Sequence, residues 1–154
     1  MRLLLAGGTG LIGGEVLRLG LKNGHEIMTV GRRPTGMASS EIVSSFDDLP
    51  QLPPADIAIC ALGTTIRQAG TQAAFRAIDE KAVSSFAKAA KAAGVDHFLV
   101  VTAVGANPDA SVFYSRVKGT AEQRLVEIGF KRLDIIRPGL LLGDRTERRP
   151  MEAL

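Results

Sequence analysis

A glycine-rich segment near the start of the chain has the spacing of a phosphate-binding turn. Gly7, Gly10 and Gly13 follow a short apolar run and precede a helical pattern. In a strand–turn–helix unit, one glycine permits the tight turn, one lets backbone approach a diphosphate, and one lets the helix pack on the strand. The helix N-terminus then offers unpaired N–H groups to the phosphates. The alternative is a tight turn without a ligand. The predicted cofactor contacts here are Gly7, Thr9, Gly10, Leu11, Ile12 and Gly13.

Two arginines indicate which dinucleotide the glycine-rich turn would bind. The expected second strand ends at Val30-Gly31-Arg32-Arg33, without the carboxylate that would hold the ribose 2′-hydroxyl of NAD. Guanidinium groups match a phosphate with planar, bidentate donors. Arg32 and Arg33 therefore favour NADP over NAD, and a solvated surface pair is the alternative.

A tyrosine and a lysine have the spacing for acid–base chemistry. Tyr114 and Lys118 lie four residues apart at the front of an expected helix, so they share one face. A nearby cation favours the phenolate and lowers the pKa of a phenol, which suits proton transfer to a carbonyl that receives hydride. Thr102, at the end of the preceding strand, is the candidate holder of the substrate oxygen. The alternatives are a half-buried tyrosine, a solvated lysine and an ordinary strand-end threonine.

A third loop is expected at the same crevice. Ala61, Leu62 and Gly63 end a buried apolar strand, and their small side chains would let the adenosine half of a cofactor pass closely. A plain connecting loop is the alternative. Cys60, inside that strand, is interpreted as an inert core thiol.

These motifs sit in a chain of alternating strands and helices. Apolar segments with strand character recur over 2–6, 26–30, 41–44, 56–62, 97–101 and 133–136. Helical spacing between them indicates βαβ units and a parallel sheet covered on both faces. The predicted class is α/β, a three-layer Rossmann fold with a doubly wound sheet of strand order 3-2-1-4-5-6. We expect a dinucleotide-binding domain over 1–142, a polar segment over 143–154 that begins a lid, and an absent or reduced C-terminal substrate lobe.

Composition limits the remaining classes. With one cysteine and two histidines among 154 residues, a metal site is not expected. No apolar run reaches the roughly 20 residues of a membrane span. The net charge is +3, but 5% aromatic residues and no tryptophan argue against nucleic-acid binding. The expected protein is cytoplasmic, binds a small-molecule substrate, and is compatible with a helix-mediated homodimer.

With these residues placed, the chain resembles the short-chain dehydrogenase/reductase superfamily in its extended or atypical branch. It looks most like the HIV Tat-interacting-protein-like oxidoreductases and their bacterial relatives. The matching stretches are 7–14, 61–65, 101–106, 114–119 and 137–142, with a similar polar run over 143–150.

The resemblance implies an NADP-binding Rossmann domain with Tyr114 and Lys118 as the catalytic pair, and Arg137 and Pro138 beside the cofactor. Many relatives carry two serines where this chain has Thr102-Ala103, which puts the catalytic hydroxyl in question. Relatives also continue past the point where this chain stops.

Together, the residues and the resemblance predict an NADP(H)-dependent oxidoreductase that passes hydride to or from a small carbonyl or alcohol. The alternatives are a non-catalytic NADP-binding regulator that senses redox state, and a sugar-nucleotide epimerase or dehydratase.

Overall fold

The computed structural model describes residues 1–139, so the predicted polar segment over 143–154 lies outside the described residues. Within the described part, six strands form one sheet, and every neighbouring pair is parallel. The order is β3-β2-β1-β4-β5-β6, which confirms the predicted doubly wound topology. The strands are β1 (Arg2–Ala6), β2 (Glu26–Gly31), β3 (Ser40–Val43), β4 (Ile57–Cys60), β5 (His97–Val101) and β6 (Arg132–Ile136).

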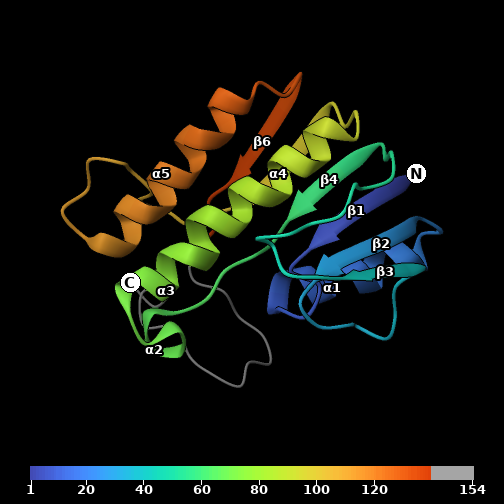
Figure 1. Ribbon diagram of the computed structural model, residues 1–154, viewed down its shortest axis with the longest axis horizontal. Coiled ribbons are helices and arrows are strands. Elements are labelled where there is room, and N and C mark those ends of the chain that lie inside the picture. Colours follow the sequence, from blue (N-terminus) through green and yellow to red (C-terminus); the bar gives the residue numbers. More distant parts are fainter. Residues whose placement is uncertain (140–154) are drawn as a thin grey trace.

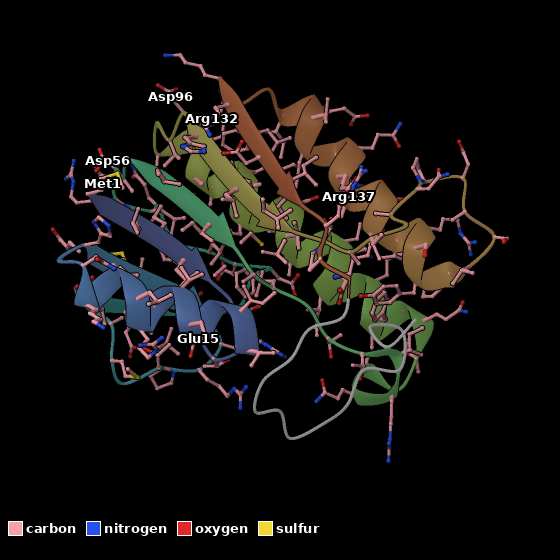
Figure 2. The ribbon with its side chains drawn as sticks, turned by 180° about the vertical axis from the view of Figure 1, so that it is seen from behind. Met1, Glu15, Asp56, Asp96, Arg132 and Arg137 are labelled. Carbon is pink, nitrogen blue, oxygen red and sulfur yellow. The ribbon has the colours of Figure 1, made fainter. Side chains whose placement is uncertain are left out.

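Helices cover both faces of this sheet. One face carries α1 (Leu11–Lys22), and the other carries α4 (Val83–Ala92) and α5 (Phe113–Ile128), as Figures 1 and 2 show from opposite sides. Two short helices, α2 (Ile66–Ala69) and α3 (Gln72–Arg76), lie between β4 and α4. The three layers are those of a Rossmann fold.

Each face of the sheet has its own core because side chains alternate along a strand. Leu3 and Leu5 of β1 pack with Leu17 of α1. Leu4 points to the opposite face, in a cluster that includes Phe86 of α4 and Leu125 of α5. Burying one such side chain contributes about 1.5–3 kcal/mol, so the two clusters fix the layers on the sheet.

The structure refines the predicted elements in one place that matters for function. Apolar residues from Phe75 to Phe86 recur at the spacing of one regular helix, but α3 and α4 are joined by a π-helical segment, η1 (Ala77–Ala82). Such π-helical segments are rare and are frequent at functional sites. Asp79 and Glu80, both in η1, are almost fully buried.

The parallel arrangement brings the predicted site residues to one edge of the sheet. In Figure 2, Asp96 and Arg132 mark the edge where strands begin, and Arg137 marks the opposite edge where they end. The glycine turn after β1 and the loops after β2 and β4 leave the sheet at that carboxyl edge. In open α/β sheets this is the edge at which ligands bind.

Candidate functional site

The glycine turn after β1 has no room for side chains. Gly7 has a φ of +89°, and a Cβ added to it would lie 2.5 Å from the Ala61 backbone. A Cβ added to Gly13 would lie 1.9 Å from the Gly7 carbonyl oxygen. The turn therefore packs backbone against backbone on two sides, which only glycine allows.

The first turn of α1 is open to an anion. Gly10 is the N-cap of α1, no side chain caps the helix, and its first turn carries no acidic residue. Helix N-termini leave their first N–H groups without intrahelical partners and carry a partial positive charge. The turn and the helix start thus fit the diphosphate of a dinucleotide.

A cleft of about 790 Å³ lies at this point, walled by the loops that follow β1, β2 and β4. Its described lining includes many of the predicted cofactor contacts: Gly7, Thr9, Gly10, Leu11, Arg32, Arg33, Ala61, Leu62 and Gly63. The other predicted site residues are not part of that lining: Ile12, Gly13, Thr102, Tyr114, Lys118, Arg137 and Pro138.

Arg32 and Arg33 are exposed on the cleft side of the loop after β2. Neither forms an ion pair with another residue in the range 1–139. Glu41 ties this loop down, accepting hydrogen bonds from the Thr35 hydroxyl, the Thr35 N–H at 2.6 Å and the Gly36 N–H at 3.0 Å. The Thr35 hydroxyl is the main cause that holds the pKa of Glu41 below its usual range. Because Arg32 and Arg33 are exposed at the cleft and have no ion-pair partner among residues 1–139, their guanidinium groups are available to a ligand.

Tyr114 and Lys118, the predicted acid–base pair, lie in α5. Tyr114 lies in the first turn of α5 and is 8% exposed, with its ring centroid 5.6 Å from that of Phe75. The Lys118 Nζ lies 5.6 Å from the centroid of the tyrosine ring. The predicted pair therefore shares one helix face, as the spacing indicates, but neither residue lines the cleft.

Lys118 is held by a carboxylate that the sequence reasoning missed. Its Nζ lies 2.5 Å from Asp79 Oδ1, and both side chains are buried. The other oxygen, Asp79 Oδ2, accepts the Thr64 N–H at 3.0 Å, and Thr64 lines the cleft. Asp79 thus connects the buried lysine to the cleft wall.

Thr102 is engaged by a second missed carboxylate. Its hydroxyl donates to Glu122 Oε1 at 2.6 Å, and Glu122 also accepts two hydrogen bonds from Arg137, at 2.9 and 2.6 Å. The interaction with Glu122 raises the pKa of the Arg137 guanidinium. The Thr102 hydroxyl proton is therefore used within the protein, and its role toward a substrate stays a prediction.

One signal for the missed acids was present in the sequence. Glu122 lies four residues after Lys118, on the helix face that also carries Tyr114. Asp79 gave no such signal, because its partners Lys118 and Thr64 are distant along the chain and the π-helical segment alters the helix period.

Cys60 is fully buried, and burial raises the pKa of its thiol to about 12, which agrees with an inert core residue. Among residues 1–139, no group of three His, Cys, Asp or Glu side chains is arranged to hold a metal ion. No helix in that range is long and apolar enough to cross a membrane.

Curated proteins of similar sequence match most of this chain. No family model matches the chain. It is 38% identical to Protein HTATIP2 of Rattus norvegicus, over 85% of this chain and 55% of that protein. It is 37% identical to the mitochondrial protein FMP52 of Meyerozyma guilliermondii, over 94% of this chain and 67% of that protein. The chain therefore spans a little over half to two thirds of these relatives.

Solved structures share the fold. The human epimerase family protein SDR39U1, determined with NADPH, superposes with a TM-score of 0.73 and 24% identity, over 93% of this chain and 55% of that one. A UDP-glucose 4-epimerase from Thermotoga maritima, determined with UDP-glucose, gives a TM-score of 0.76 and 16% identity, over 96% and 58%.

Fold and glycine turn together define a Rossmann domain whose first strand–turn–helix unit has the geometry of a phosphate-binding turn. Its curated relatives place it more narrowly: the chain belongs to the extended short-chain dehydrogenase/reductase superfamily, with HTATIP2 and FMP52. The family that the sequence motifs suggested is thereby confirmed.

The expectation of a cytoplasmic protein is wrong. Several fungal relatives, 30–37% identical to this chain, are named mitochondrial. A lone reduced cysteine is compatible with any reducing compartment, so composition could not discriminate between them.

Proposed function

We propose that this chain binds NADP(H) and belongs to an oxidoreductase that transfers hydride to or from a small carbonyl or alcohol. The observation that carries the proposal is the cleft, which is lined by the uncapped N-terminus of α1, by the glycine turn, and by Arg32 and Arg33, two arginines with no ion-pair partner among residues 1–139. The α1 end would hold the diphosphate, and Arg32 and Arg33 would hold the 2′-phosphate. Structures of similar fold were determined with NADPH, as SDR39U1 was, or with NAD, so they support a nicotinamide cofactor, and the choice of NADP rests on Arg32 and Arg33.

Tyr114 is the proposed acid–base residue. NADPH, when bound, supplies hydride to a carbonyl carbon. As negative charge develops on the carbonyl oxygen, the Tyr114 hydroxyl donates its proton to it, and in the reverse direction the phenolate accepts the alcohol proton. The Lys118 ammonium, 5.6 Å from the ring centroid, stabilises the phenolate, which supports this assignment.

A second candidate is a non-catalytic NADP-binding regulator. The observation that favours it is that Tyr114 and Lys118 are buried and do not line the cleft, and that Thr102 already donates to Glu122. A protein of this kind would keep the cofactor site and signal its occupancy without turnover.

Cofactor titration by calorimetry tests the first half of the proposal. We expect NADPH and NADP⁺ to bind more tightly than NADH and NAD⁺. Replacing Arg32 or Arg33 by Ala removes charge-assisted hydrogen bonds worth about 1.5–3 kcal/mol, or roughly ten- to a hundredfold in NADPH affinity. Arg18→Ala is the control, because Arg18 is exposed on α1 and pairs with Glu15. Equal or tighter NAD binding would overturn the NADP assignment.

The Tyr114→Phe variant separates the enzyme from the regulator. Phenylalanine keeps the ring packing against Phe75, so the fold and NADPH affinity should be unchanged. With phenanthrenequinone and a panel of aromatic aldehydes as probes, an enzyme should lose about 10²–10⁴-fold in turnover. Wild-type turnover that survives the substitution would reject Tyr114 as the acid–base residue. Absence of turnover in a wild-type protein that binds NADPH would favour the regulator.

A further inference from the structure

The π-helical segment η1 places two consecutive acidic side chains in the interior. Asp79 and Glu80 are 1% and 2% exposed, although neighbouring residues on a helix do not normally face the same way. Glu80 pairs with Arg76 at 2.5 Å and with Arg124 at 2.9 Å, and both of these arginines reach solvent. Asp79 instead faces Lys118, whose side chain is 5% exposed. The two acids therefore have different partners, since Glu80 pairs with arginines that reach solvent and Asp79 pairs with a buried lysine.

The two oxygens of Asp79 have different partners. Oδ1 lies 2.5 Å from the Lys118 Nζ, which is its only charged partner in the described part of the chain. Oδ2 accepts the N–H of Thr64 at 3.0 Å. Because Thr64 lines the cleft and Lys118 lies beneath the Tyr114 ring, one carboxylate spans both parts of the site.

Stability alone does not account for this pair. Removing two charges from water costs as much as their attraction returns, and buried ion pairs can often be replaced by apolar side chains without loss. A lysine side chain has four rotatable bonds and needs a fixed anion to hold its ammonium at one point. Asp79 supplies that anion, on a segment whose backbone departs from the regular helix to do so.

We propose that Asp79 is a positioning residue that fixes the Lys118 ammonium beneath Tyr114 and couples it to the Thr64 backbone at the cofactor cleft. This inference rests on the proposed NADP(H) function. Asp79 acts through Lys118 and Thr64. When the Thr64 loop moves as the cleft fills, the lysine moves with it, so cofactor binding and acid–base geometry are linked.

A double-variant cycle with Asp79→Asn and Lys118→Met tests the link. Asn keeps an acceptor for the Thr64 N–H but removes the charge. Lys118→Met alone leaves a buried carboxylate unpaired and risks misfolding, so Asp79→Asn/Lys118→Met, which neutralises both groups, is the folded comparator. Glu80→Gln is the matched control, because it removes a buried charge from the same segment without touching Lys118.

Two measurements are made on each variant: NADPH affinity, and turnover with phenanthrenequinone split into kcat and KM. We expect Asp79→Asn to lose about ten- to a hundredfold in kcat or NADPH affinity, as for a reacting group displaced by about 1 Å. The KM for the quinone should change little. Glu80→Gln should lower the melting temperature only. The double variant should lose no more than the more impaired single variant, because both substitutions break one interaction.

A third measurement needs no cofactor. If lysine and loop are coupled through Asp79, amide hydrogen exchange at Thr64 should be faster in Lys118→Met than in wild type, and it should be no faster in the double variant than in Asp79→Asn. The inference is overturned if Asp79→Asn behaves like Glu80→Gln, or if the losses of the two single variants multiply in the double variant. It is also overturned if amide exchange at Thr64 is as slow in Lys118→Met as in wild type. A wild-type protein that binds no dinucleotide overturns the proposed function instead, while the exchange result still decides the coupling.

Discussion

Replacing Gly13 by Ala tests whether the glycine turn is built for a ligand. The added methyl carbon would lie 1.9 Å from the Gly7 carbonyl oxygen and 2.6 Å from the Gly7 carbonyl carbon. Ordinary contact begins only at 3.4 Å, so α1 must move away from the turn. The obstacle is the backbone of Gly7 and Gly8, so no side-chain rotation can relieve the clash.

The magnitude follows from two opposing effects. Alanine is favoured over glycine inside a helix by about 0.8–1.0 kcal/mol, whereas overpacking costs about 1–3 kcal/mol. We expect a net loss of stability of up to about 2 kcal/mol. The larger effect is on binding, since a displacement of about 1 Å costs about a hundredfold when a binding group must be held in place. NADPH affinity should therefore fall by about a hundredfold, which corresponds to about 2.8 kcal/mol and is somewhat larger than the expected loss of stability.

Gly14→Ala is the matched control. A Cβ there would meet its nearest atom, the Gly8 carbonyl oxygen, at 3.6 Å, which is ordinary contact. This variant should be more stable than wild type by up to about 1 kcal/mol, which raises Tm by about 2–4 °C. Its NADPH affinity should be unchanged. Calorimetric titration and thermal unfolding measure both quantities. If Gly13→Ala binds NADPH as tightly as Gly14→Ala does, the cradle is not where the diphosphate lies.

Further predictions follow from packing and from charge. Gly119→Ala should destabilise the protein by about 1–3 kcal/mol in denaturant unfolding, because its methyl would lie 2.2 Å from the backbone of Asn107; wild-type stability would show that the loop yields. Cys60 should resist iodoacetamide in the folded protein at about pH 8.5, where an ordinary thiol is half ionised, since burial raises its thiol pKa to about 12; labelling as fast as in urea would contradict this. The lowered pKa of Glu41 means that its bonds to Thr35 contribute stability above the usual Glu pKa, lost as pH falls through the lower folded value. Glu41→Gln should flatten that part of the pH–stability curve, and an unchanged acid limb would argue against the assignment.

Much of the fold and of the candidate cleft could be predicted from local sequence pattern. The apolar run before Gly7 and the helical spacing after Gly13 predict a strand, a turn and a helix, and the structure has them as β1 and α1. Arg32 and Arg33 follow β2, and they line the cleft because parallel strands all end at one edge of the sheet. Residues close in sequence carry these features, so the sequence expresses them directly.

The interior of the site was decided by contacts between distant segments. Asp79 meets Lys118 and Thr64, and Glu122 meets Thr102 and Arg137, only after the helices have packed on the sheet. Charged residues are read from sequence as solvated, because burying an unpaired charge is prohibitive. Whether a buried charge meets an oppositely charged partner depends on which way each helix face points and on how the helices cross. The π-helical segment changes which way its residues point. The amino-acid order thus determined the sheet and the phosphate turn, whereas packing alone determined which carboxylate holds the lysine.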